Sequence, residues 1–327
     1  MATLGGLDEP FERMTPAEAS ALLQSLYAIE PTGLGLLDTE RDDSFHASTP
    51  GGDYVLKVAH PDDDPLLVNL QSAAMSFAAE REPSLPLQQL LLTVDGEFEP
   101  TVVVGGRERV ARLLTWLGGS PLNEVRPDGD QLELLGSTLG ALSVGLSAFD
   151  HPAAHREFVW DVAQLPLLRA SLADWPIPEV ANALDLFDRV VEPSLPNLPR
   201  QVIHNDFHLG NVLADPRSRA FVTGVIDFGD VVYSVRVADL AVALSYLIFP
   251  GEHTQQELSR FIEGFESRVP LTHGEQAVLP ALVIARFAQR ILVNLQLARG
   301  NPDDRGAAEL AAQTNRAVLA ALLEKEN

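Results

Sequence analysis

The spacing of apolar positions changes character along the chain. Residues 15–29 carry apolar side chains at helical spacing behind a threonine and a proline, which favours a helix. Residues 33–60 alternate over short segments broken by turn residues, as in an antiparallel meander. Helical spacing returns at 65–80, and residues 87–117 contain two more strand-like segments. The pattern predicts about five short strands and one inserted helix before residue 117.

After the glycines at 118–119, helical spacing dominates. Residues 200–230 are the exception, because two short apolar strands there flank polar loops. We expect an α+β fold with a β-rich lobe over 1–117, holding a five-stranded antiparallel sheet plus helices, and a larger, mainly helical lobe over 118–327. Ligands tend to bind between such lobes. The expected helices of the second lobe are 130–149, 181–191, 236–248, 254–266, 274–299 and 305–325.

Composition narrows the possible partners. The 327 residues are 46% hydrophobic and 21% charged, as in an ordinary soluble globular protein, and they contain no cysteine. No run of about 18 apolar residues and no signal-like N-terminus is present, so we expect a cytoplasmic protein without membrane contact. The net charge of −23 argues against nucleic-acid binding. It either favours a cationic co-substrate or serves only solubility. A monomer or homodimer is expected.

The segment HNDFHLGN, residues 204–211, concentrates polar side chains between apolar flanks. His204, Asp206 and His208 alternate, so on a strand they could share one face and hold zinc. Asp206 and Asn211 could instead be the base and the metal ligand of a phosphoryl-transfer loop. The cluster could also tie down a buried turn.

A second cluster, VIDFGD at 225–230, favours the phosphoryl-transfer hypothesis. Two strand-like segments separate Asp206 from Asp227, and a hairpin of that length can bring both carboxylates to one end. Asp206-x-x-x-x-Asn211 followed by Asp227-Phe-Gly has the order and spacing of a kinase catalytic loop and its magnesium aspartate. Asn211 and Asp227 would offer the hard oxygen ligands that Mg²⁺ prefers.

Such a site also needs a cation for the nucleotide phosphates. Lys57 lies in the alternating segment DYVLKVAH, ahead of the helix at 65–80 and of the catalytic-loop motif. A lysine on a strand is usually solvated, but this placement in an acidic chain predicts a phosphate contact.

These motifs resemble those of the aminoglycoside phosphotransferase and choline kinase superfamily, whose fold is protein-kinase-like. The signature H-x-D-x-x-x-x-N with a following I-D-F-x-D stands here at 204–211 and 226–230. The segments YVLKVAHP, VARLLTWLGGSPL and VIDFGDVVYSVRVADLAVALSYLI are similar to the hydroxylysine kinase-like branch. The resemblance covers residues 15–300.

The resemblance implies a role for each matching residue. Asp206 would be the catalytic base, Asn211 and Asp227 would bind Mg²⁺, and Lys57 would contact the phosphates of ATP or GTP. The segment 114–117 would be the interlobe hinge, with the backbone of Thr115, Trp116 and Leu117 facing the nucleobase. RDDSFHA at 41–47 would cover the phosphates, with Ser44 as a contact. Weaker candidates for acceptor contacts are Asp230, Tyr233, Arg236 and His208.

Some polar residues near the motifs are expected to support the structure, and two features of protein kinases are missing from the sequence. We expect His204 to be scaffold and Asp239 to anchor the loop backbone. The glycine-rich loop of protein kinases is absent, and the residue nearest the usual acidic partner of Lys57 is Gln71. Arg286 and Arg290 share one helix face, which is solvated by default but could serve an amino-acid acceptor.

The sequence therefore predicts a small-molecule kinase that transfers the γ-phosphoryl group of ATP or GTP to a hydroxyl of a hydroxylated amine or amino acid resembling hydroxylysine. An aminoglycoside O-phosphotransferase is the alternative within the same chemistry. A non-catalytic nucleotide-binding regulatory protein is the alternative from another class.

Overall fold

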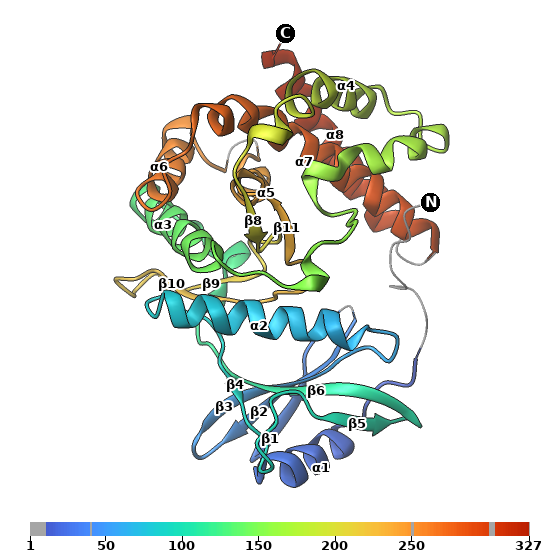
Figure 1. Cartoon of the computed structure of the whole chain (residues 1–327), viewed down its shortest axis with the longest axis vertical. Coiled ribbons are helices and arrows are strands. Elements are labelled where there is room, and N and C mark those ends of the chain that lie inside the picture. Colours follow the sequence, from blue (N-terminus) through green and yellow to red (C-terminus); the bar gives the residue numbers. More distant parts are fainter. Residues whose placement is uncertain (1–10, 40, 250–251, 301–304, 327) are drawn as a thin grey trace.

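A computed structural model describes residues 11–39, 41–249, 252–300 and 305–326, and it divides into a β-rich part and a helical part (Figure 1). The β-rich part is a sheet of order β1-β2-β3-β6-β4, with β5 paired to β6. Its strands are antiparallel throughout. The elements of this part are α1 (Pro16–Tyr27), β1 (Gly33–Leu36), β2 (Asp43–Thr49), β3 (Gly52–Val58), α2 (Pro65–Arg81), β4 (Leu90–Leu91), β5 (Thr101–Val104) and β6 (Arg107–Thr115).

Strand alternation gives this sheet two different faces. Phe45, Leu56 and Leu113 point to one face and form a buried cluster that includes side chains of α1. Ser44 and Arg112, the register partners of Lys57 on its two sides, share its place on the other face. In Figure 1 that second face carries α2, which lies between the sheet and the helical part. The face with Lys57 is therefore the one directed toward the rest of the molecule.

The sheet has six strands where the sequence led us to expect five. The additional strand is β5, which pairs with β6 across Gly105 and Gly106. Both glycines have positive φ, 57° and 77°, as a two-residue hairpin turn of this kind requires. The pair of glycines is thus a hairpin signal that the sequence analysis did not use.

The helical part contains two small antiparallel sheets, one of two strands and one of three. In Figure 1 the two-stranded sheet lies among the helices, and the three-stranded sheet lies at the edge next to α2. Strand β8 pairs with β11, and β9 pairs with both β10 and β7. The strands are β7 (Ser120–Pro121), β8 (Arg200–Ile203), β9 (Val212–Ala214), β10 (Val222–Val225) and β11 (Val232–Val235). The α-helices are α3 (Gly129–Leu146), α4 (Pro178–Leu186), α5 (Val237–Leu247), α6 (Gln255–Glu266), α7 (His273–Gly300) and α8 (Arg305–Glu326), joined by shorter turns that include Val162–Ala173 and Phe187–Val191.

Close packing of helices in this part depends on glycine. A Cβ atom on Gly136 of α3 would lie 1.9 Å from the Phe261 carbonyl oxygen, and one on Gly264 of α6 would lie 2.1 Å from the Glu133 carbonyl oxygen. The two glycines therefore let the backbones of α3 and α6 touch.

Helix α7 forms the core of the helical part. By length and composition its segment His273–Arg299 could cross a membrane, but most of it is buried inside the protein. This is weak evidence for a membrane span, because core helices meet the same criteria.

Candidate active site

The loop after β8 is held in place by a buried carboxylate. Asp239 in α5 accepts backbone hydrogen bonds from His204 (3.0 Å) and Asn205 (2.6 Å). Asn205 has a φ of 65°, a left-handed conformation that costs energy for a residue other than glycine. Burial raises the pKa of Asp239 to about 6. The geometry matches the anchoring role expected for Asp239.

His204 supports the same loop from inside. Its ring is fully buried and packs edge-on against Phe228, with centroids 4.8 Å apart. The Asp206 backbone N–H donates to its Nδ1 at 3.3 Å. Burial lowers its pKa to about 4, so the ring is neutral at physiological pH. His204 is therefore scaffold, as we had expected.

Asp206 and Asn211 face each other across this loop. The Asn211 amide nitrogen donates to the Asp206 side chain at 2.7 Å and to the Asp206 carbonyl at 3.1 Å. Both acceptors require the NH₂ end, so the amide oxygen of Asn211 points the other way. That oxygen is suited to bind a metal ion.

The hairpin of β9 and β10 returns the chain to the same place. Asp227 follows β10, has a φ of 65° and accepts a hydrogen bond from the Gly229 N–H at 3.1 Å. Crowding by protein atoms acts to raise its pKa, but the charge of Lys57, the Gly229 N–H and the two loop histidines outweigh this and lower it. Asp227 is thus an ionised, exposed carboxylate close to Lys57 and the loop.

The surroundings of Asp206 favour its protonated form. Desolvation raises its pKa well above the usual range, Asp230 raises it further, Arg286 opposes this, and Asp227 adds to the rise. The Asp206 side chain still keeps 21% of its surface exposed. A carboxylate with a raised pKa beside an open face is a suitable proton acceptor.

Lys57 has an acidic partner that sequence reasoning did not find. Its Nζ lies 3.5 Å from Oδ2 of Asp42, just before β2, and the same oxygen lies 3.6 Å from Arg112 on β6. Gln71, the position we had considered for this partner, instead accepts from Arg112 at 3.1 Å. The kinase-like lysine is therefore oriented by a carboxylate from the sheet rather than from helix α2.

We expect Asp42→Asn to raise the KM for the nucleotide by roughly tenfold, the typical worth of an oriented charge pair of about 1.4 kcal/mol, while the acceptor KM stays unchanged. Gln71→Ala is the matched control, because Gln71 touches Arg112 and not Lys57. Steady-state kinetics with the nucleotide varied would check this, and a larger effect of Gln71→Ala than of Asp42→Asn would contradict it.

The segment 41–47 does not form the loop that we had expected over the phosphates. Residues 43–49 are strand β2, because their alternating side chains pair in full register with β3. Ser44 is 1% exposed, and its buried hydroxyl has no hydrogen-bond partner among the described residues. Ser44 is next to Lys57, but it is buried within the sheet face rather than placed on a covering loop.

In the hinge segment, residues 114–117, only some of the backbone groups are available to a nucleobase. The N–H of Thr115 donates to the Gln89 carbonyl at 2.9 Å, and that of Trp116 donates to the Asp53 carbonyl at 3.0 Å. Gln88 also donates to the Thr115 carbonyl at 3.1 Å. The Thr115 backbone is therefore engaged within the small lobe and is wrong as a nucleobase contact, which leaves the Trp116 carbonyl and Leu117 as candidates.

The four weaker acceptor candidates divide into two groups. His208 lies with its Nε2 3.5 Å from Asp206, and Asp230 acts electrostatically on Asp206. Tyr233 instead lies against His155 and Arg200, and Arg236 forms an ion pair with the buried Glu275 at 2.6 Å. Tyr233 and Arg236 therefore have partners of their own within the protein, and their role as acceptor contacts stays a prediction. In the register of β11 with β8, Tyr233 lies opposite Val202, near the loop, and Val235 lies opposite Arg200, further from it.

The zinc hypothesis does not fit this geometry. The Nδ1 atoms of His204 and His208 each accept a backbone N–H. Across the part of the chain that the structure describes, no group of three or more His, Asp or Glu side chains could hold a metal ion. Asn211 and Asp227, which are suited to share a metal with phosphate oxygens, fit a magnesium site better.

Comparison with known proteins gives the family of this chain. The model of the phosphotransferase enzyme family matches residues 35–275, well over half of the chain, so the protein belongs to this family. It is a small-molecule kinase with a hydroxyl acceptor and a protein-kinase-like fold. Both were expected from the motifs.

The chain is similar over most of its length to several individual kinases. Hydroxylysine kinase of Bos taurus is 28% identical over 91% of this chain and 86% of its own length, and that of Mus musculus is 26% identical over 92% and 87%. A microcompartment-associated aminopropanol kinase has a similar fold, with a TM-score of 0.72, 21% identity, and coverage of 94% of this chain and 96% of that one. An amicoumacin kinase in complex with AMP-PNP and Ca²⁺ gives a TM-score of 0.71 at 15% identity, covering 94% of both chains.

Proposed function

We propose that this kinase transfers the γ-phosphoryl group of ATP or GTP, with Mg²⁺, to the hydroxyl of a small hydroxylated amine or amino acid such as hydroxylysine. The observation that carries the proposal is the convergence of Asp206, Asn211 and Asp227 at one loop, with the charge of Lys57 acting on Asp227. The two hydroxylysine kinases, which the chain matches over most of its length, support the acceptor class.

In this mechanism the loop residues and the small lobe divide the tasks between them. Asp206 orients the acceptor hydroxyl toward the γ-phosphorus and accepts its proton, and Asn211 holds the Asp206 carboxylate in place. Lys57 binds phosphate oxygens, while the Trp116 carbonyl and Leu117 face the nucleobase. Asn211 and Asp227 would hold Mg²⁺, which neutralises charge on the phosphates. Catalysis is then mainly positioning and charge stabilisation.

The negative charge around the loop favours a cationic acceptor. The charges of Asp230 and Asp227 both act on Asp206, and the chain carries a net charge of −23. An ammonium group next to the reacting hydroxyl would reduce the repulsion among these carboxylates. Asp230 is the residue that we assign to this ammonium group.

A substrate panel tests the proposal. Nucleotide consumption is measured with ATP and with GTP against hydroxylysine, ethanolamine, homoserine, choline and an aminoglycoside. We expect turnover with the small amino alcohols and the highest kcat/KM with hydroxylysine. If no acceptor gives a nucleotide-dependent product, the proposal is contradicted and a non-catalytic regulatory protein is favoured. A preference for the aminoglycoside would instead favour an aminoglycoside O-phosphotransferase.

The value of kcat/KM should fall at acidic pH, and the pKa values of carboxyl groups should determine where this acid limb lies. The pKa of Asp206 lies well above the ordinary value for an aspartate, and that of Asp239 is about 6. Both must be ionised for activity, so a raised pKa moves the loss of activity to higher pH. The pKa of His208 is lowered to about 4 by burial and by Arg286, so protonation of His208 does not set this limb.

We therefore expect kcat/KM to fall as pH decreases toward about 6, and His208→Gln to keep this limb. A profile that stays flat down to pH 4.5, or a limb that disappears in His208→Gln, would contradict the assignment.

A further inference from the structure

Two arginines of α7 point into the helical part beside the catalytic loop, rather than outward to solvent as is usual. Arg286 is 1% exposed and its partners are fixed: it donates to the Trp160 carbonyl and to Gln289, both at 2.7 Å. Its second terminal nitrogen lies 3.9 Å from Asp206. Arg286 therefore has the task of holding the loop and its carboxylate.

Arg290, one turn further along α7, has no comparable polar partners. It donates one long hydrogen bond of 3.4 Å, to the Ser245 carbonyl. Its guanidinium lies 4.1 Å from the centre of the Tyr246 ring, with Phe249 and Phe287 slightly further away. Within the described ranges no carboxylate lies within 4.0 Å of its nitrogens, and the charge of Asp206 acts on it from further away. A partly buried guanidinium among aromatic rings has most of its donors free.

Contacts connect Arg290 to the reacting position. Tyr246, over which Arg290 lies, also stacks on His208 at 5.1 Å. His208 in turn has its Nε2 3.5 Å from Asp206. The Asp206 charge acts on Arg290 directly. Arg290 therefore lies close enough to Asp206 for one acceptor molecule to contact both residues. The hydroxyl of the acceptor would bind Asp206, and another of its groups would bind Arg290.

The site is thus negative around Asp227 and Asp230 and positive around Arg286 and Arg290. An amino acid carries the matching pair of charges, an ammonium group and a carboxylate. We propose that Arg290 binds the carboxylate of the acceptor, so that the enzyme selects hydroxylated amino acids over amino alcohols that lack a carboxylate. This inference rests on the proposed function and adds the group by which the acceptor is chosen.

The physical basis is the cost of an unpaired charge. A guanidinium binds a carboxylate through two parallel hydrogen bonds. An amino alcohol without a carboxylate would leave the guanidinium of Arg290 among aromatic rings without a carboxylate partner. Sites built to bind one polar group discriminate strongly against analogues that lack it.

The test compares hydroxylysine with its decarboxylated analogue, 1,5-diaminopentan-2-ol, and homoserine with 3-aminopropanol. The wild-type enzyme should prefer the carboxylate-bearing member of each pair by about 100-fold in kcat/KM. Arg290→Gln should raise the KM for hydroxylysine by about 30-fold or more and leave kinetics with the decarboxylated analogue within about threefold. Arg290→Lys should restore part of the preference, because it keeps the charge but not the two-pronged geometry.

The matched control is Arg219→Gln, an exposed arginine on the hairpin between β9 and β10. Thermal unfolding of each variant separates a folding defect from a binding defect. Equal use of both members of each pair by the wild-type enzyme would overturn the inference and leave the proposed function standing. An equal loss toward both members in Arg290→Gln would also overturn it. No turnover with any of the four compounds would overturn the proposed function together with the inference.

Discussion

Asp206→Asn should lower kcat by about 10³-fold while nucleotide binding stays within about threefold of wild type. The substitution keeps the shape of the side chain and removes the negative charge that attracts and accepts the hydroxyl proton. Asn211, which donates to the Asp206 side chain at 2.7 Å, can still donate to the amide oxygen of the new residue. The loop should therefore keep its conformation, so the loss falls on the chemical step.

Asp227→Asn provides the contrast within the same site. Asp227 interacts with the charge of Lys57 and is an expected metal ligand. Its loss should therefore weaken binding of the metal–nucleotide complex and also lower kcat. Titration of a fluorescent nucleotide with and without Mg²⁺ measures the first effect, and steady-state kinetics measure the second. A kcat of Asp206→Asn within tenfold of wild type would show that Asp206 is not the proton acceptor.

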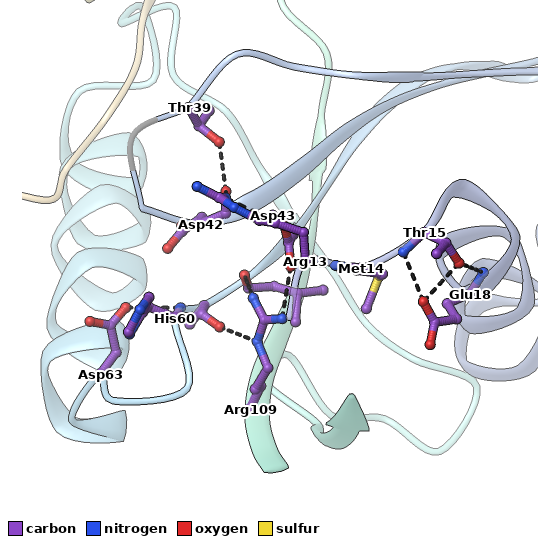
Figure 2. Close-up of polar contacts among 12 residues, drawn as sticks. Arg13, Met14, Thr15, Glu18, Thr39, Asp42, Asp43, His60, Asp63 and Arg109 are labelled. Atoms are coloured by element: carbon purple, nitrogen blue, oxygen red, sulfur yellow. Dashed lines mark hydrogen bonds and ion pairs between the residues drawn. The ribbon is translucent and has the colours of Figure 1, made fainter. Parts of the chain in front are cut away.

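Asp43→Ala should destabilise the fold by about 3–5 kcal/mol, because it leaves a buried arginine without its carboxylate. Asp43 is 0% exposed and lies 2.7 Å from Arg109, whose side chain is 1% exposed. Arg109 also donates to the Val58 and Ala59 carbonyls, at 2.9 and 2.6 Å (Figure 2). The pair joins β2, β3 and β6 at one corner of the sheet.

This corner also positions the partner of Lys57. Asp42 and Asp43 are consecutive, so their side chains point to opposite faces of the sheet. Arg13 donates to the Asp42 carbonyl, and the Met14 N–H donates to the Asp43 carboxylate, both at 3.0 Å (Figure 2). We expect the loss of Asp43 to disturb the Asp42–Lys57 contact on the opposite face.

The control for this prediction is Asp188→Ala, which removes an ion pair with Arg169 in which both side chains are well exposed. Such pairs contribute about 0–1 kcal/mol, so its stability should hardly change. Urea unfolding gives the free energy of unfolding for each variant. A loss for Asp43→Ala no larger than that for Asp188→Ala would contradict the assignment of Asp43–Arg109 as a structural ion pair.

The sequence was sufficient for the parts of the site that lie close together along the chain or in a fixed order. Asp206 and Asn211 lie in one loop, and the segments flanking Asp227 had readable strand patterns, so spacing alone predicted their meeting. The long helices were also predicted within a few residues, because burial on one side leaves a strong period in the sequence.

Contacts between distant segments could not be read in the same way. Asp42 became visible as the partner of Lys57 only once the register of β2 against β3 was known, because Asp42 stands just before β2, in a segment that the sequence analysis placed over the phosphates. Tyr233 and Arg236 follow the Asp227 motif closely in sequence, yet their partners His155, Arg200 and Glu275 come from distant segments. The position of Arg290 near the catalytic loop depends on how α7 packs against that loop, and no local sequence pattern specifies this packing.

We propose phosphoryl transfer to a hydroxyl whose proton Asp206 accepts. ³¹P NMR of a reaction containing hydroxylysine, ATP and Mg²⁺ measures this transfer, with Asp206→Asn as the parallel sample. We expect a new phosphate-ester signal coupled to the proton on the hydroxyl-bearing carbon, with ADP formed in equal amount and neither signal in the variant. Release of inorganic phosphate alone, a phosphoramidate signal, or the same ester from Asp206→Asn at the wild-type rate would contradict it.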